Sequence, residues 1–184
     1  MKRTTFAQPY SNRSEQHGAA LIVSLIILVI MTMLGLAAIR GVTQQERMAG
    51  NSQSRNVSFQ ASEWALREIE AKIESTSPRI TQTAGTCGVV STVMTCGAPA
   101  TSDTPRWRDS IFINWTDCTA VGTGSQAITP KYFVEYLGNT YSCNPNDPSA
   151  ATNCLRYRIT VRSGGGASGR AQVMLQSVYA TSNV

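Results

Sequence analysis

The sequence predicts an α+β protein in which the second half of a long N-terminal helix packs on an antiparallel β-sheet. Three observations lead to this fold class: an uncharged apolar run, a helical pattern that continues without proline until Pro78, and alternating apolar and polar residues near the C-terminus. We expect four parts: a polar N-terminal stretch, an apolar helix half, an amphipathic helix half and a sheet-rich head, at residues 1–18, 19–39, 40–75 and 76–184.

The apolar run from Ala19 to Ile39 has the length of a membrane-spanning helix. Its 21 residues carry no charge, and at 1.5 Å per residue they span about 31 Å, close to a hydrocarbon core of about 30 Å. The apolar region of a cleaved secretory signal is shorter, about 7–15 residues. The run therefore predicts a membrane-inserted helix rather than a buried core helix or a removed signal.

Residues 40–75 continue the helix as an amphipathic segment with five basic and five acidic side chains. Glu63 with Arg67, and Glu68 with Lys72, form favourable pairs at i,i+4. Ser75-Thr-Ser-Pro78 supplies the stop. Apolar residues recur at helical spacing and predict the stripe that faces the sheet: Phe59, Ala65, Leu66, Ile69 and Ile73.

The residue patterns of the head, residues 76–184, predict loops and strands. Residues 80–130 are rich in Thr, Ser and Gly and predict loops with short strands, in which Trp107 and residues 111–115 serve core or inter-strand packing. Patterns of β-branched and aromatic residues predict three longer strands, with a glycine-rich hairpin loop between the last two. These strands are expected at residues 131–137, 155–162 and 170–180.

All five cysteines follow the apolar run, and none forms a CxxC pair. Their spacings match no common zinc pattern, so they predict disulfides in an oxidising compartment. The head should then lie outside the cytoplasm, with residues 1–18 inside. Our first pairing is Cys143 with Cys154, which bracket a turn-rich loop. The second is Cys87 with Cys96, which leaves Cys118 unpaired, and the other arrangements stay open.

Composition argues against an enzyme and against a specific nucleic-acid partner. The single histidine, His17, precedes the apolar run, so the head has no imidazole for triad or zinc chemistry. The net charge of +5 is spread thinly along the chain. Arg156, Arg158 and Arg162 share one strand face, which we interpret as a solvated face rather than a contact with nucleic acid or an acidic partner.

Two further motifs favour structural roles, so we expect no metal and no cofactor. Gly164, Gly166 and Gly169 satisfy G-x-G-x-x-G, but a strand follows them where a dinucleotide fold needs a helix. Oxygen-bearing side chains at 144, 146 and 147 could hold calcium, but they lack a downstream glutamate. A turn is the favoured interpretation of Asn144, Asn146 and Asp147.

The N-terminal region resembles that of PilX-type minor pilins of type IV pili. The resemblance covers residues 16–75 and is carried by His17-Gly-Ala-Ala-Leu-Ile-Val23, Gln45-Glu-Arg-Met-Ala-Gly-Asn51, Arg55-Asn56 and Phe59-Gln-Ala61. Tyr157-Arg-Ile-Thr and Leu175-Gln-Ser are similar to the same family with less weight. The resemblance implies a type IV pilin-like fold.

The resemblance also implies processing and assembly. Residues 1–18 would be a leader, which prepilin peptidase removes between Gly18 and Ala19 before Ala19 is N-methylated. Residues 19–39 would hold the subunit in the inner membrane, in contact with lipid, with the head in the periplasm. After assembly the same residues would pack in the core of an extracellular fibre.

One departure from the pattern of major pilins sharpens the expected role. Their fifth mature residue is a glutamate, whereas this chain has Val23. The absence of a glutamate at this position implies a tip-proximal subunit that primes assembly and helps to present a tip adhesin. The expected partners are other minor and major pilins, the prepilin peptidase, the inner-membrane assembly platform and that adhesin.

Two alternatives remain open at this point. A K-type minor pseudopilin of type II secretion also lacks this glutamate, but it usually carries a large helical insertion, and residues 76–130 are too short for one. A single-span, membrane-anchored periplasmic binding module would instead keep residues 1–18.

Overall fold

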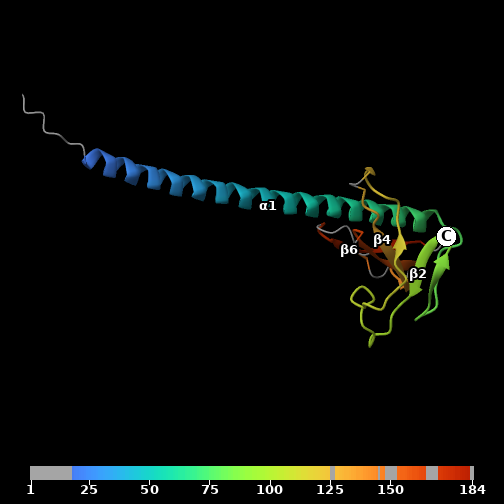
Figure 1. The fold of residues 1–184 in the computed structure, drawn as a ribbon. Coiled ribbons are helices and arrows are strands. Elements are labelled where there is room, and N and C mark those ends of the chain that lie inside the picture. The colour runs from blue at the N-terminus through green and yellow to red at the C-terminus, as the bar shows by residue number, and fades with distance from the viewer. Residues whose placement is uncertain (1–17, 125–126, 145, 148–152, 165–169, 183–184) are drawn as a thin grey trace, which may run out of the picture. The chain divides into compact units, whose positions relative to one another are not determined.

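The computed structural model describes residues 18–124, 127–144, 146–147, 153–164 and 170–182. It divides into two compact units, residues 1–48 and 49–184, and each is described by itself (Figure 1). The described residues form one helix and six strands. Their bounds are α1 Ala19–Ser75, β1 Cys87–Val90, β2 Val93–Gly97, β3 Thr116–Asp117, β4 Lys131–Tyr141, β5 Cys154–Arg162 and β6 Met174–Thr181.

Helix α1 has the predicted bounds, and its end has a local cause. The guanidinium of Arg79 donates to the carbonyl oxygens of Ile73 (3.3 Å) and Glu74 (2.6 Å). The Thr76 hydroxyl donates to the Lys72 carbonyl (2.7 Å). The last turn of a helix leaves such carbonyls without partners. The side chains that follow Ser75 therefore satisfy them and close the helix.

The sheet has the strand order β1-β2-β4-β5-β6, and β3 pairs with β4 beside Tyr132. All neighbouring strands are antiparallel except β2 and β4, which run parallel. The predicted antiparallel sheet is thus confirmed with one parallel pair. The long connection between β2 and β4 allows that pair, because parallel neighbours need a crossover rather than a tight turn.

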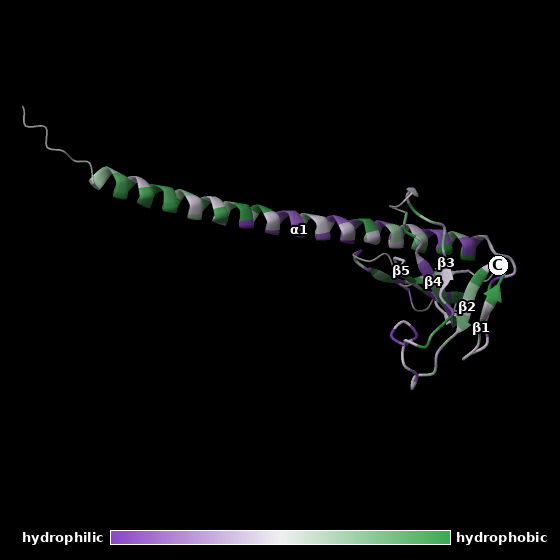
Figure 2. Ribbon diagram, viewed as in Figure 1, coloured by the Kyte–Doolittle hydropathy of each residue, from purple (hydrophilic) through white to green (hydrophobic). Residues whose placement is uncertain are grey.

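The core lies between one face of the sheet and residues 49–75 of α1. Figure 2 shows the helix against the sheet in this unit. The Tyr157 hydroxyl donates to the Ile80 carbonyl (2.7 Å), so the polar end of this buried ring is satisfied. Buried apolar residues on both sides include Ala65, Ile69, Ile73, Val93, Tyr132, Val134, Leu155, Tyr157, Ile159 and Val161.

The long predicted strands are present with shifted ends. Strand β4 extends beyond residue 137 to Tyr141, with register shifts around Gly138, whose φ of 126° suits glycine. Strand β6 begins at Met174 instead of residue 170. The predicted hairpin loop falls mostly on residues 165–169, which lie outside the described residues.

Candidate functional site

The first candidate surface is the apolar helix segment from Ala19 to Ile39. Every side chain in it is exposed, and the segment is long and apolar enough to cross a membrane. Its two polar side chains return to the helix backbone: Ser24 donates to the Leu21 carbonyl (2.9 Å) and Thr32 to the Val29 carbonyl (2.8 Å). The segment therefore presents an apolar surface without an unpaired hydroxyl.

The predicted processing positions lie at the start of this segment. Gly18 is exposed and precedes the first helical residue, Ala19, and a β-carbon added at Gly18 would meet nothing within 4 Å. Val23 is an exposed residue of the same helix. The rest of the predicted leader, including His17, lies outside the described residues.

The helix segment that packs on the sheet buries small residues that the sequence pattern missed. Ser58, Ala61 and Ser62 are buried, whereas the predicted Phe59 is 43% exposed and does not belong to the buried stripe. The Ser58 hydroxyl donates to the Ala171 carbonyl (2.7 Å). A hydropathy pattern selects apolar residues such as Phe59 and passes over serines. The contact between helix and strand is close here, and small residues allow it.

Carboxylates of α1 attach the helix to the sheet. Glu68 accepts hydrogen bonds from Lys72 (2.7 Å) and from the Thr119 hydroxyl (3.0 Å). Burial acts to raise the pKa of Glu68, but these hydrogen bonds outweigh it and lower the pKa. The hydrogen bond to Glu68 raises the pKa of Lys72. This predicted i,i+4 pair therefore also holds the loop that follows β3, at residue 119.

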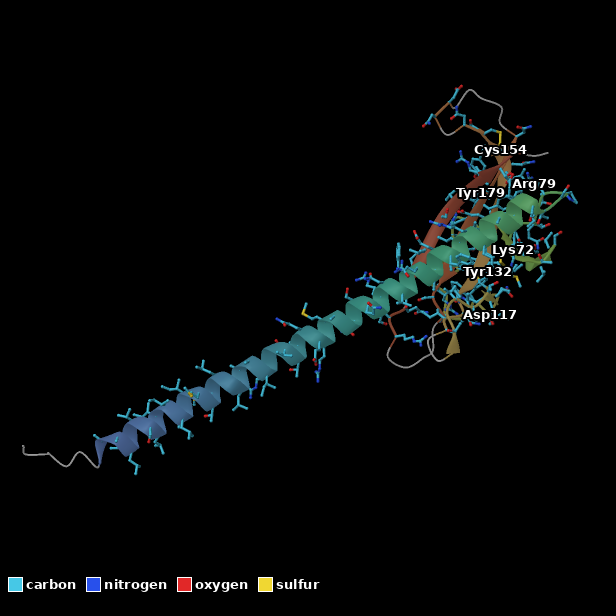
Figure 3. All side chains as sticks on the ribbon, turned by 90° about the horizontal axis from the view of Figure 1, so that it is seen from above. Lys72, Arg79, Asp117, Tyr132, Cys154 and Tyr179 are labelled. Carbon is cyan, nitrogen blue, oxygen red and sulfur yellow. A yellow bond between two sulfur atoms is a disulfide. The ribbon has the colours of Figure 1, made fainter. Side chains whose placement is uncertain are left out.

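A second carboxylate acts near the end of the helix. Glu74 accepts from the hydroxyls of Tyr179 (2.7 Å) and Thr181 (2.8 Å). The hydrogen bond from Tyr179 and then that from Thr181 lower the pKa of Glu74. Burial, followed by the bond to Glu74, raises the pKa of Tyr179 to about 12. Figure 3 shows Tyr179 and Arg79 close to this end of α1.

The arginine row on β5 is a packed surface, and our interpretation as a solvated face was wrong. Arg158 lies 3.5 Å from the buried Glu135, and Arg106, from the loop between β2 and β3, lies 2.7 Å from the same carboxylate. Arg156 stacks over Tyr141, and Arg162 stacks over Trp115 at 4.0 Å. The signal that could have revealed this arrangement is Glu135, because a carboxylate at an interior strand position needs cationic partners.

Burial lowers the pKa of Arg162. Its Nε has no hydrogen-bond partner among the described residues, and the stacked Trp115 ring offers the guanidinium a cation–π contact instead. The outer face of the sheet is thus held by charge and stacking, not by water alone.

The prediction that residues 111–115 pack in the core is half wrong. Phe112 and Trp115 stack edge-to-face on Phe133, each with ring centroids 4.8 Å apart. Ile111 and Ile113 are 81% and 85% exposed. Trp107 is also exposed, beneath the Arg108 guanidinium. Among the apolar side chains at 111, 112, 113 and 115, the aromatic pair packs on the sheet and the two isoleucines stay exposed.

Two disulfides tie the edges of the head. One joins Cys87 to Cys96 and the other joins Cys143 to Cys154. These are the two pairs that the sequence analysis put second and first. Cys118 is a free thiol that lies buried, and burial raises its pKa to about 12. A thiol with such a pKa is protonated at neutral pH and therefore unreactive.

The motif of Asn144, Asn146 and Asp147 makes local contacts. The Asn144 side chain accepts from the Asn146 N–H (3.0 Å), and the Asp147 N–H donates to the Asn144 carbonyl (3.1 Å). These are turn contacts, as predicted. Among the described residues, no group of three or more His, Cys, Asp or Glu residues could hold a metal. Gly166 and Gly169 lie outside the described residues, so the glycine motif is described only at Gly164.

A groove of about 650 Å³ runs beside the packed part of α1. Its walls come from the first turns of that segment and from the loop before β4, and most of the wall is apolar. It has the size to receive side chains of a neighbouring protein. Sequence reasoning missed it because the residues that form it come from distant parts of the chain. They are Gly50, Gln53, Ser54, Val57, Ser58, Ala61, Val121, Gly122, Ile128 and Arg170.

These surfaces define a class of protein. A helix whose apolar residues 19–39 are exposed, and whose later residues pack on a mainly antiparallel sheet, is the architecture of a type IV pilin-like subunit. Among the described residues, the chemistry of these surfaces is that of packing and association.

The chain belongs to the PilX family of type IV pilus assembly proteins. The family described as PilX N-terminal matches residues 17–67, and the family described as Type IV pilus assembly protein PilX C-term matches residues 69–181. Membership identifies a minor pilin, a structural component of pilus assembly that interacts with other pilus components. No curated protein and no solved structure matches the chain.

Proposed function

We propose that this chain is a tip-proximal minor pilin that primes pilus assembly and helps to present a tip adhesin. The observation that carries the proposal is the apolar segment Ala19–Ile39. It begins directly after Gly18, exposes every side chain, and has Val23 where major pilins place a glutamate.

The apolar segment supports two successive environments. Lipid surrounds it before assembly, and the helices of other subunits replace lipid in the fibre. A buried carboxylate in hydrocarbon is costly unless it is paired. A subunit with valine at the fifth mature position has no carboxylate that needs a partner on a neighbouring subunit above it. This suits a position at the tip.

Processing follows from the same segment. In this proposal the prepilin peptidase cuts between Gly18 and Ala19 on the cytoplasmic side, and Ala19 is then N-methylated. The head lies in the periplasm, where the disulfides form, and reaches the cell exterior in the fibre. Contacts with the inner-membrane assembly platform and with major and other minor pilins belong to the same role.

The experiment that tests this function is N-terminal sequencing combined with intact mass. The protein is recovered separately from membranes and from sheared surface fibres. We expect a chain that starts at methylated Ala19 in both fractions, with far fewer copies than the major pilin in the fibres. A chain that starts at Met1 and occurs only in membranes would instead support an anchored periplasmic binding module.

Priming requires a separate measurement. Deletion of the gene should reduce the number of surface fibres per cell, and the intact chain should restore it, because a primer acts once per fibre. A Val23→Glu variant tests the tip position. If the tip proposal is correct, this variant assembles less well or moves into the shaft. Unchanged fibre number and location would contradict it.

A further inference from the structure

The last strand of the sheet has one open edge. Strand β6 stands at the end of the order β1-β2-β4-β5-β6, so β5 is its one neighbour among the described strands. All eight residues of β6 pair with β5 without a register shift. The strand therefore presents a regular edge on its other side.

The hydrogen bonds identify which backbone groups are open. The Ser163 N–H donates to the Val173 carbonyl (2.8 Å), one step before β6 in the same register. Backbone groups along an antiparallel strand alternate between the two sides. The N–H and C=O groups of Met174, Gln176, Val178 and Ala180 therefore point away from β5, and no hydrogen bond given by the described residues reaches them.

This edge lacks the features that protect other sheet edges from pairing. Natural edges are short, charged, bulged or interrupted by proline. Strand β6, with the sequence MLQSVYAT, has no charge and no proline. The opposite edge, β1, is only four residues long and is tied to β2 by the Cys87–Cys96 disulfide. The two edges thus differ in length and in the disulfide that ties β1, although both lack charge and proline.

The helix provides a wall beside the open edge. Glu70 and Glu74 accept hydrogen bonds from Ser177 and Tyr179, so their side of α1 faces β6. Phe59 and Leu66 lie on the same side, because they precede Glu70 by eleven and four residues, close to whole helical turns. The exposure of Phe59, which the sequence pattern placed in the core, leaves an apolar ring next to this edge.

We propose that β6 accepts an extended segment of another pilus subunit as an added strand. Open N–H and C=O groups select a β-strand. The exposed Met174 and Val178 select uncharged side chains on the outer face. The exposed Phe59 selects an apolar side chain on the helix face, and Glu70 selects a basic residue there. The inference rests on the proposed role as a pilus subunit for the kind of partner, and on β6 for the site.

The direction of β6 argues against a second copy of this chain as the partner. Ser54, Ser62 and Glu74 contact Ala171, Val173 and Tyr179 in ascending order, so the helix and β6 run the same way. Two β6 strands paired antiparallel would direct their helices in opposite directions. Such a pair would give the two copies opposite orientations, which does not suit neighbouring subunits of one fibre.

Site-specific photo-crosslinking in cells that assemble the pilus tests this proposal with the full chain. A photoreactive amino acid replaces Val178 on the open edge, and in the control it replaces Val89 on β1. The two positions are matched in exposure, at 59% and 63%. Mass spectrometry then maps the adduct. We expect position 178, and not position 89, to capture one extended segment of another pilus subunit.

Backbone variants show whether capture depends on strand pairing. Gln176→Pro removes an outward N–H that the β5 ladder does not use, and Gln176→Thr keeps it. We expect Gln176→Pro to reduce the adduct about tenfold, equivalent to about 1.4 kcal/mol, and Gln176→Thr to leave it unchanged. Protection of the buried Cys118 thiol from alkylation verifies folding. If Gln176→Pro fails that check, Ala180→Pro takes its place.

Three results would overturn the proposal in cells where the chain is processed and present in fibres. The first is the absence of an adduct at position 178. The second is an adduct whose yield stays the same in a proline variant with a folded head. The third is an adduct between two copies of this chain. Failure of processing or of fibre incorporation would instead count against the proposed function, and the same samples report it.

Discussion

The two parts of α1 bury side chains in opposite ways. Residues 19–48 have no buried side chain, although this part contains the apolar run. Residues 49–75 are more polar and include all the buried positions of the helix: Ser58, Ala61, Ser62, Ala65, Ile69 and Ile73. Hydrophobicity along this helix therefore does not identify its contact with the sheet.

The difference shows what each part is selected for. The apolar part needs a medium or a partner from outside the chain, so it is uniformly apolar around its circumference. The packed part needs close approach and matched hydrogen bonds as well as apolar contact, so it buries serines and alanines beside Ile69 and Ile73. One continuous helix can thus carry two surfaces with separate requirements, and substitutions in the two parts should have separate consequences.

The largest expected effect is the truncation of a buried isoleucine. Ile69→Ala should lower the free energy of unfolding of the head by about 2–5 kcal/mol, because it leaves a cavity in the core. Ile27→Ala is the matched change in the exposed part and should leave that free energy unchanged. Urea unfolding of the full chain in detergent, followed by tryptophan fluorescence, measures both. Equal losses would remove the distinction between the two parts.

The next effect concerns a serine in each part. Ser58→Ala removes the donor to the Ala171 carbonyl and should cost about 1–3 kcal/mol, because the buried carbonyl loses its partner. Ser24 bonds only within its own helix turn, so Ser24→Ala should leave head unfolding unaffected. The same urea titration reports both variants. If Ser58→Ala leaves the free energy of unfolding unchanged, the hydrogen bond of this serine does not contribute to the stability of the head.

A smaller effect should appear as a dependence on pH. The folded head holds the pKa of Glu74 below its ordinary value of 4.5. A carboxyl with a lowered folded pKa stabilises above its unfolded pKa, and this contribution is lost as pH falls through the folded pKa. The urea concentration at the unfolding midpoint should therefore decrease as the pH is lowered below about 4.5.

Tyr179→Phe removes the first donor to Glu74 and should weaken this dependence, as should Glu74→Gln. Midpoints measured from pH 6 to the acid limit of solubility compare the three chains. An identical acid dependence in both variants would assign it to other carboxylates. Glu68, whose pKa is also lowered, is the first of these.

The smallest effect is expected for a pair that the sequence pattern selected. Glu63 and Arg67 are exposed and lie 4.0 Å apart. Arg67→Ala should change the free energy of unfolding by about 0.5 kcal/mol or less. Lys72→Ala should cost more, because its partner Glu68 also holds Thr119. Equal effects of the two substitutions would show that the contact with residue 119 adds nothing.

Local patterns predicted much of the fold. Proline at 78 and continuous helical spacing defined α1, and the alternation from Leu155 to Val161 predicted the buried face of β5. Both depend on neighbours in sequence, which a single chain displays directly. The pairing of Cys143 with Cys154 could be reasoned in the same way, because the two residues bracket one turn.

Features that depend on distant partners were not predictable. The parallel pairing of β2 with β4 and the charges that meet at Glu135 join segments with no shared local signal. Phe59 was wrongly placed in the buried stripe of the helix. Helical spacing shows which residues share a side of the helix, but not which side the sheet covers. Processing at Gly18 and Ala19 stays a prediction, since only the resemblance implied it.

The contacts between α1 and β6 impose an order on biosynthesis. Hydrogen bonds such as those of Ser54 with Ala171 and Glu74 with Tyr179 join residues 117 and 105 positions apart. At about 5–20 residues per second, translation separates such partners by about 5–25 seconds. During that interval the apolar segment can already be inserted in the bilayer while the buried stripe of the helix has no sheet to cover it. A chaperone that shields an amphipathic helix would find its substrate in this interval.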